Sequence, residues 1–172
     1  EWISKIRYEW KLDTINTARN LDIPVVNVHT PCDLMHVGHT RGVFDRKSDA
    51  TLGEIAAELN EVEEIKTTPY EEAVVHGDPD AKPGLVYNPM GAGWRPPLSM
   101  FEMACEVGIN SAVFVSPDEN FFAMGRKYNV NIVELPHNSN DNHGINLMLD
   151  ELEKVQPLTI YDAHNFRRVR RV

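Results

Sequence analysis

Apolar residues recur along this chain at two spacings, one typical of amphipathic helices and one typical of short buried strands. Positions that repeat at intervals of three and four predict helices over residues 3–20, 51–60, 98–107, 117–128 and 144–154. We expect Asp49 or Thr51 to cap the second of these helices, and Pro97 to take the first position of the third.

Runs of branched and aromatic residues predict strands, over residues 23–28, 73–75, 85–87, 111–115, 130–135, 158–161 and 166–172. Because these runs alternate with the predicted helices, we expect an α/β fold with a mixed, partly parallel sheet and flanking helices. The length of 172 residues fits a single domain, 1–172, with its own core. The sequence starts without Met, inside a predicted helix, so we expect it to be the later portion of a longer chain.

Composition and charge narrow the class of protein. The sequence is 42% hydrophobic and 25% charged, and no apolar run approaches the roughly 20 residues of a membrane span. Cys32 and Cys105 form no disulfide framework, which favours the cytoplasm, and we expect Cys105 in the core. The net charge of -9 is concentrated in residues 49–80, where ten acids stand against the single base Lys66. We expect a solvated face there and no nucleic-acid partner. The basic end, residues 167–171, is expected on an edge strand with its charges outward.

The stretch from His29 to His39 gathers side chains that bind metals or transfer protons. His29, Cys32, Asp33, His36 and His39 all follow a predicted strand. In α/β proteins the carboxyl ends of strands are where ligands and chemistry collect, so we expect the functional site here. Cys32 has no evident base partner in the sequence, and a role as nucleophile is not expected.

Part of this stretch is repeated later in the chain. Residues 18–29 align with residues 125–137: each copy is a helix end with an Arg, a turn, and an Ile/Val strand that stops at a histidine. A carboxylate follows four residues after each histidine, in His29…Asp33 and His137…Asp141. The fold class therefore includes an internal helix–strand–His-x-x-x-Asp repeat.

The repeat points to a metal site. If both predicted strands lie in one parallel sheet, the two loops emerge at the same edge and four ligands converge. Imidazole and carboxylate together bind Zn, Mn, Fe or Co, and carboxylate-rich sites also accept Mg. Two structural alternatives are a helix cap for Asp141 and a hydrogen-bonded loop histidine for His137.

One resemblance lies within residues 33–39, Asp-Leu-Met-His-Val-Gly-His. This segment resembles the His-x-Gly-His signature of nucleotidylyltransferases, whose two histidines contact nucleotide phosphates. In that family the motif opens a helix, and a strand soon follows. Residues 40–49 carry Gly and charge and are expected to interrupt such a fold, and the family's basic second signature is missing. A nucleotidylyltransferase using His36 and His39 is thus an alternative function.

A second resemblance covers most of the chain. The segment His29-Thr-Pro-Cys-Asp33 is similar to the His-Thr-x-x-Asp motif of the dinuclear-metal GTP cyclohydrolase I type 2-like family, also called the NGG-interacting-factor-three family. Residues 136–144 are similar to that family's late His-x-x-x-Glu motif, and the family is internally duplicated. The resemblance implies that Asp33, His137 and Asp141 are metal ligands, with Asp141 bridging two ions. His29 would be a ligand or a partner of one.

Two departures from the family pattern bear on that site. Asp141 stands where the family has Glu, which shortens the reach by one methylene. The family's early His-His pair has no counterpart before His29. The missing ligands then lie upstream of Glu1, or His36 and His39 replace them, or the site is incomplete.

The function implied by the resemblance is metal-dependent hydrolysis of a nucleotide or a similar small substrate, with nucleotide ring opening as the family's precedent. The cofactor would be Zn, Mn, Fe or Mg, with two ions possible, and His29 is the candidate proton shuttle. The resemblance also implies a ring-shaped homo-oligomer, with neither nucleic acid nor membrane as a partner. A non-enzymatic scaffold or metal sensor that uses the acidic face for docking is the other alternative.

Overall fold

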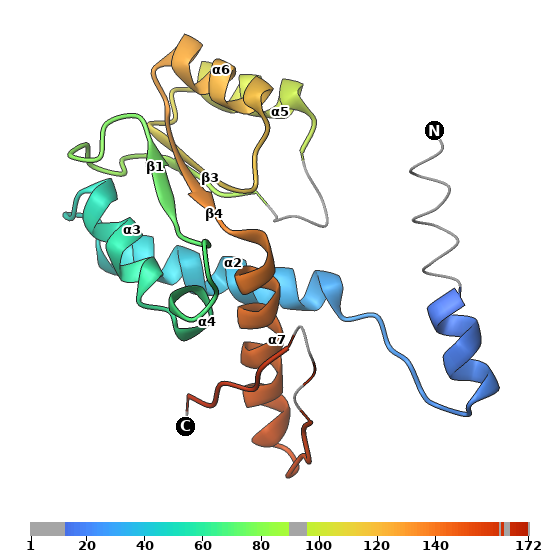
Figure 1. Ribbon diagram of the computed structural model, residues 1–172. Helices are drawn as coiled ribbons and strands as arrows, with labels where there is room; N and C mark the ends of the chain where they lie inside the picture. Colours follow the sequence, from blue (N-terminus) through green and yellow to red (C-terminus); the bar gives the residue numbers. More distant parts are fainter. Residues whose placement is uncertain (1–12, 90–95, 162, 164–165, 172) are drawn as a thin grey trace.

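The computed structural model describes residues 13–89, 96–161, 163 and 166–171 (Figure 1). Its helices and strands occur in the order α2 (His29–Arg46), α3 (Leu52–Asn60), α4 (Glu63–Lys66), β1 (Val74–His76), β2 (Val86–Tyr87), α5 (Leu98–Glu106), β3 (Ser111–Val115), α6 (Glu119–Tyr128), β4 (Asn131–Leu135) and α7 (His137–Glu153). A helix over residues 13–20 precedes them, and the rest of the helix predicted over residues 3–20 lies outside the described residues. Among the described helices, none is long and apolar enough to cross a membrane.

The four strands form one mixed sheet, which confirms the predicted α/β class. Their order is β1-β4-β3-β2, with β1 antiparallel to β4 and the remaining pairs parallel. β3 lies at the predicted position, residues 111–115, and β4 pairs with it along its whole length. Helices α5 and α6 lie on one side of the sheet and α2 and α3 on the other (Figure 1).

Each face of the sheet carries its own apolar core, because successive side chains of a strand point to opposite faces. Ala112 and Phe114 of β3 pack with the residues of α5 and α6, whereas Val113 packs on the side of α2 and α3. Cys105 belongs to the α5–α6 core, as predicted. The other core consists of Val43, Phe44, Leu52, Ile55, Ala56, Leu59, Ala73, Val113, Val133 and Leu135.

The N-terminus of helix α3 is capped by one of the two residues that the sequence predicts. Thr51 is its N-cap, and the Thr51 hydroxyl accepts a hydrogen bond from the backbone N–H of Glu54 at 3.2 Å. The Glu54 carboxylate accepts one in return from the backbone N–H of Thr51 at 2.8 Å. This reciprocal capping box selects Thr51 over Asp49 as the cap.

The strand predicted over residues 23–28 is wrong. This segment is extended but belongs to no strand, and Figure 1 shows it leading away from the body of the protein to the helix at 13–20. Its apolar side chains are exposed, with Ile23 at 54%, Val25 at 56% and Val26 at 79%. A strand needs a neighbour to satisfy its backbone hydrogen bonds, and no described segment pairs with this one.

Both histidines of the repeat begin a helix. α2 starts at His29, and α7 starts at His137 after the single linking residue Pro136. The helix predicted over residues 144–154 therefore starts seven residues earlier than expected, because the polar residues 137–143 form the first turns of α7. The segment 40–49 also does not interrupt the fold as expected, since α2 continues to Arg46.

The predicted strands at the C-terminal end are wrong as well. Residues 158–161 and 166–171 form no strand, and one bridge joins Ala163 to Phe166. The basic segment does not hold all of its charges outward. The Arg168 side chain is 5% exposed and pairs with Asp150 at 2.5 Å and with Glu153 at 2.8 Å.

Arg171 makes a second inward contact from the same segment. It pairs with Glu64, whose side chain is 3% exposed. The Nδ2 of Asn146 on α7 also donates a hydrogen bond to Glu64, at 2.9 Å. Glu64 is therefore buried, unlike the solvated acidic face expected for residues 49–80. Through Arg168 and Arg171 the C-terminal segment contacts both α7 and α4.

Helices α2 and α7 cross one another in close contact (Figure 1). Gly144 of α7 permits this contact: a Cβ at that position would lie 2.4 Å from the carbonyl oxygen of Cys32 on α2. Cys32 Sγ also lies 4.0 Å from Met148 Sδ one helical turn further along α7. This contact sets the N-terminal turns of the two helices beside one another.

Candidate metal centre

The two copies of the His-x-x-x-Asp motif occupy equivalent places in the structure. Each spans the first turn of a helix, so the histidine and the aspartate lie one turn apart on the same face. His29 Nε2 lies 3.5 Å from Asp33 Oδ2, and His137 Nε2 lies 3.5 Å from Asp141 Oδ2. The sequence repeat thus corresponds to a repeated local geometry, although helix starts, rather than strand ends, create it.

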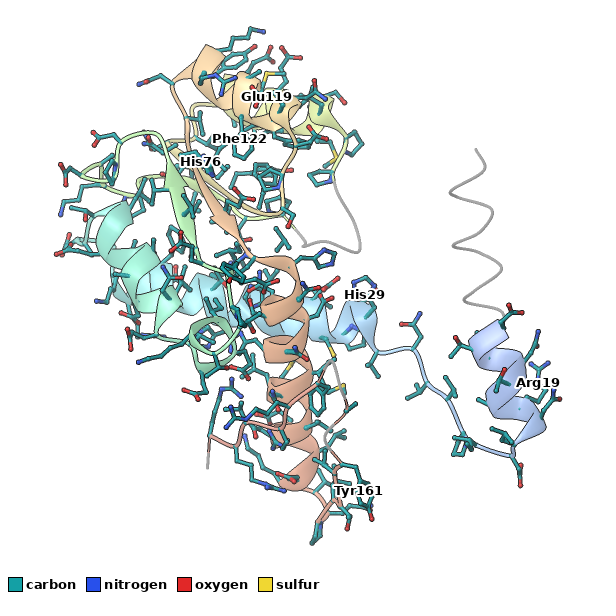
Figure 2. All side chains as sticks on the ribbon, viewed as in Figure 1. Arg19, His29, His76, Glu119, Phe122 and Tyr161 are labelled. Carbon is teal, nitrogen blue, oxygen red and sulfur yellow. The ribbon has the colours of Figure 1, made fainter. Side chains whose placement is uncertain are left out.

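Packing of α2 against α7 brings the motifs together. His29, Asp33 and Asp141 each offer a ligand atom, and these atoms lie within 4.8 Å of one another, so the group could hold a metal ion. His137 stands beside this group through its contact with Asp141. Figure 2 shows His29 at the start of α2, close to where α7 begins.

The pKa of each of the two carboxyl groups of the site is raised above its ordinary value. Burial raises the pKa of Asp33, and the nearby His29 and His137 oppose this rise. Burial also raises the pKa of Asp141; His137 and His29 oppose this rise, and the charges of Asp33 and Glu71 add to it. The buried carboxylate of Asp33 and the half-buried carboxylate of Asp141 together favour a bound cation, which would offset both effects.

One oxygen of the Asp33 carboxylate lacks a hydrogen-bond donor within the described part of the chain. Its side chain is 8% exposed, and its Oδ2 accepts no hydrogen bond from any described residue. A buried carboxylate oxygen without a donor is costly, and a ligand that accepts its lone pair removes the cost. The residue types and this oxygen, which has His29 at 3.5 Å but no hydrogen-bond donor among the described residues, both fit a divalent metal ion.

Cys32 is unsuited to nucleophilic chemistry. It is 3% exposed, and burial together with the charges of Asp33 and Asp141 raises its pKa to about 11. The thiol is therefore protonated at neutral pH, and the thiolate is the reactive form. This agrees with the expectation from the sequence.

Glu71 is a residue of this region that the sequence did not indicate. It lies before β1, and its carboxylate accepts hydrogen bonds from the first turn of α7, from Ser139 N–H and Asn138 Nδ2, both at 2.7 Å. The partners are separated by 67 and 68 residues, so no local pattern could reveal them.

His36 and His39 do not join the group of His29, Asp33 and Asp141. His36 is 4% exposed, and its Nδ1 lies 2.9 Å from Nδ1 of His143 on α7. The ring of His39 packs edge-on against that of His143, with centroids 4.5 Å apart.

This placement bears on two of the expectations from the sequence. The His-x-Gly-His segment lies in the middle of α2 rather than at a helix start, and both of its histidines face α7. The arrangement does not favour phosphate contacts by His36. It also does not support the replacement of the family's early histidine pair by His36 and His39.

The fold has a counterpart among solved structures. A crystal structure of a NIF3 superfamily protein from Sphaerobacter thermophilus matches with a TM-score of 0.63 and 20% sequence identity, over 81% of this chain and 53% of that chain. The NIF3 superfamily is the family of the NGG-interacting factor three. The predicted resemblance is thereby confirmed at the level of the fold. The chain spans about half the length of the structure it matches.

Two crystal structures of Staphylococcus aureus protein SA1388 are similar to a lower degree. They are 16% and 15% identical, each with a TM-score of 0.43, and cover 69% of this chain and 38% and 34% of their own chains. No family model and no curated protein matches the sequence.

Proposed function

We propose that this protein is a NIF3-like protein that binds a divalent metal ion through His29, Asp33 and Asp141, with His137 as a fourth ligand. The observation that carries the proposal is the grouping of ligand atoms within 4.8 Å by two helices whose motifs lie far apart in the sequence. The buried Oδ2 of Asp33, which accepts no hydrogen bond from the described residues, also supports it. Nitrogen and carboxylate ligands in this mixture suit Zn, Mn or Fe, and Mg is the further candidate.

A dinuclear centre is the extended form of this proposal. Asp141 is the candidate bridge, as the family resemblance implies. A second ion needs ligands beyond these four residues. An assembly of several copies, as the resemblance implies, is part of the same proposal.

The proposed activity is hydrolysis of a small, nucleotide-like substrate. A bound divalent ion supplies water of lowered pKa and polarises a substrate oxygen or nitrogen. In the arrangement where His29 stands beside the ion and is not a ligand, it is the candidate proton carrier, since its side chain is 47% exposed and so can reach both solvent and the site. Asp33 orients its ring from 3.5 Å. Cys32 takes no part in this scheme.

Turnover tests the activity. Purified protein is loaded with Zn²⁺, Mn²⁺ or Fe²⁺ and incubated with GTP and a panel of phosphoesters, and product is followed by chromatography. We expect metal-dependent product release that His137→Ala abolishes. His76→Ala is the matched control, because His76 pairs with Glu134 on the sheet, away from the site, at 2.7 Å.

The outcomes separate the candidate functions. Metal binding without turnover on any substrate would favour the metal-binding scaffold over the hydrolase. Absence of metal binding by the wild-type protein would refute both. Pyrophosphate release from CTP or ATP that is lost in His36→Ala would instead favour the nucleotidylyltransferase.

A further inference from the structure

Helix α7 begins without a cap of its own. Its N-cap residue is Pro136, which makes no side-chain hydrogen bond, and the first turn contains no acidic residue. The first N–H groups of a helix have no partner within the helix and require acceptors from elsewhere. In α7 this uncapped turn carries His137 and leads directly to Asp141, so its conformation sets where both side chains lie.

Glu71 supplies the acceptors from another part of the chain. Its Oε2 accepts the backbone N–H of Ser139, and its Oε1 accepts the side-chain amide of Asn138. Burial tends to raise the pKa of Glu71, but the hydrogen bonds from Ser139 and Asn138 outweigh it, so the pKa is lowered. The carboxylate is therefore charged at neutral pH, and a negative charge at a helix N-terminus is also favoured by the helix dipole.

The segment that carries Glu71 is itself anchored. Ala73, two residues later, donates its backbone N–H to Asn60 Oδ1 at 2.6 Å and accepts a hydrogen bond from Asn60 Nδ2 at 3.1 Å. Asn60 ends α3, which packs in the core. A chain of contacts thus runs from α3 through residues 71–73 to the first turn of α7.

We infer that Glu71 is a positioning residue of the metal centre: its bidentate contact with the first turn of α7 holds Asp141 and His137 opposite His29 and Asp33. This role rests on the proposed metal site. Glu71 is not one of the three grouped ligands, so it acts through α7 rather than on the ion. Removing a group that orients a metal ligand typically weakens metal affinity by about 10–100-fold.

The test compares four variants in metal-free protein titrated with Zn²⁺ against a chromophoric chelator. Glu71→Ala removes both acceptors, and Glu71→Gln keeps one carbonyl oxygen. Glu72→Ala removes the adjacent, exposed carboxylate without touching α7. Asp118→Ala removes a different helix cap, the one that accepts the N–H of Asn120 in α6 at 3.0 Å, and so matches a loss of stability without a link to the site.

We expect Glu71→Ala to weaken Zn²⁺ binding by about 10–100-fold, Glu71→Gln to fall between it and wild type, and Glu72→Ala and Asp118→Ala to bind as wild type does. Hydrogen exchange at the Ser139 amide, measured without metal, should be faster in Glu71→Ala alone.

Each contrary result has a distinct meaning. Wild-type affinity in Glu71→Ala refutes the positioning role while leaving the metal site intact. An equal loss of Zn²⁺ affinity in Asp118→Ala would mean that lowered stability, and not the contact with α7, weakens binding, and this result also refutes the positioning role. If the wild type binds no Zn²⁺, Mn²⁺ or Fe²⁺, the proposed function fails and this role fails with it. Unchanged exchange at Ser139 refutes the contact itself.

Discussion

His36 is expected to make the folded protein sensitive to acid. Its imidazole is 4% exposed, and burial, aided by the neighbouring His39, lowers its pKa from 6.5 to about 4. The unfolded chain therefore binds a proton at His36 more readily than the folded chain does. By linkage, stability is complete above pH 6.5 and is lost as the pH falls towards 4.

The size of the effect follows from the two pKa values. They differ by about 2.5, and one pKa unit corresponds to about 1.36 kcal/mol, so the full loss is about 3 kcal/mol below pH 4. Between pH 7 and pH 4.5 the same linkage relation gives a loss of about 2 kcal/mol. The free energy of unfolding of a typical domain is roughly 5–15 kcal/mol, so this loss is a large part of it.

Urea denaturation in the presence of a chelator measures this loss. The free energy of unfolding is determined at pH 7 and pH 4.5 for the wild type and for His36→Gln, which keeps a polar side chain but does not titrate. Groups remote from His36 titrate alike in both proteins, so the difference between the two pH responses reports His36 together with its effect on His143, whose pKa burial and His36 lower. We expect the wild type to lose about 2 kcal/mol more than the variant. Parallel pH responses would refute the reasoning.

Three other perturbations test the packing around α7. Arg168→Met removes the shortest ion pairs of the buried Asp150 and the partly buried Glu153, which keep Arg171 at 3.6 Å and Arg170 at 3.3 Å, and should lower the free energy of unfolding in urea by about 1–3 kcal/mol; a loss below about 1 kcal/mol would contradict the burial of the Arg168–Asp150 pair. Gly144→Ala places a methyl group 2.4 Å from the carbonyl oxygen of Cys32, so thermal unfolding should show a loss of about 1–3 kcal/mol, and wild-type stability would mean that α2 and α7 are not in this contact. Cys32, with a pKa of about 11, should resist iodoacetamide at pH 8 until urea unfolds the protein, and rapid labelling of the folded protein would contradict its burial.

The sequence predicted the sheet better than it predicted the helix starts. Residues 111–115 and 130–135 combine branched apolar residues with short length, and both lie in the centre of the sheet, where local preference and burial agree. Residues 23–28 have the same composition but no described neighbour, so strand preference alone did not produce a strand. Strand formation depends on partners that a single segment does not encode.

The site was predicted through its repeat, and its supporting contacts were not. The spacing of His29 and Asp33, and of the later pair, is a local property that a helical turn preserves. The polar residues 137–143 suggested a loop, because their helix start is stabilised by Glu71, far away in the sequence. Such long-range capping leaves no trace in local periodicity.

The proposed metal centre is shared by α2 and α7. The most direct measurement is the metal content, by elemental analysis, of protein purified at neutral pH without chelator, for the wild type, Asp33→Ala and Asp141→Ala. Asp45→Ala, an exposed aspartate at the other end of α2, is the control. We predict at least one bound divalent transition-metal ion in the wild type and in Asp45→Ala, and its loss in both site variants. A wild-type protein without metal, or site variants that retain it in full, would contradict the claim.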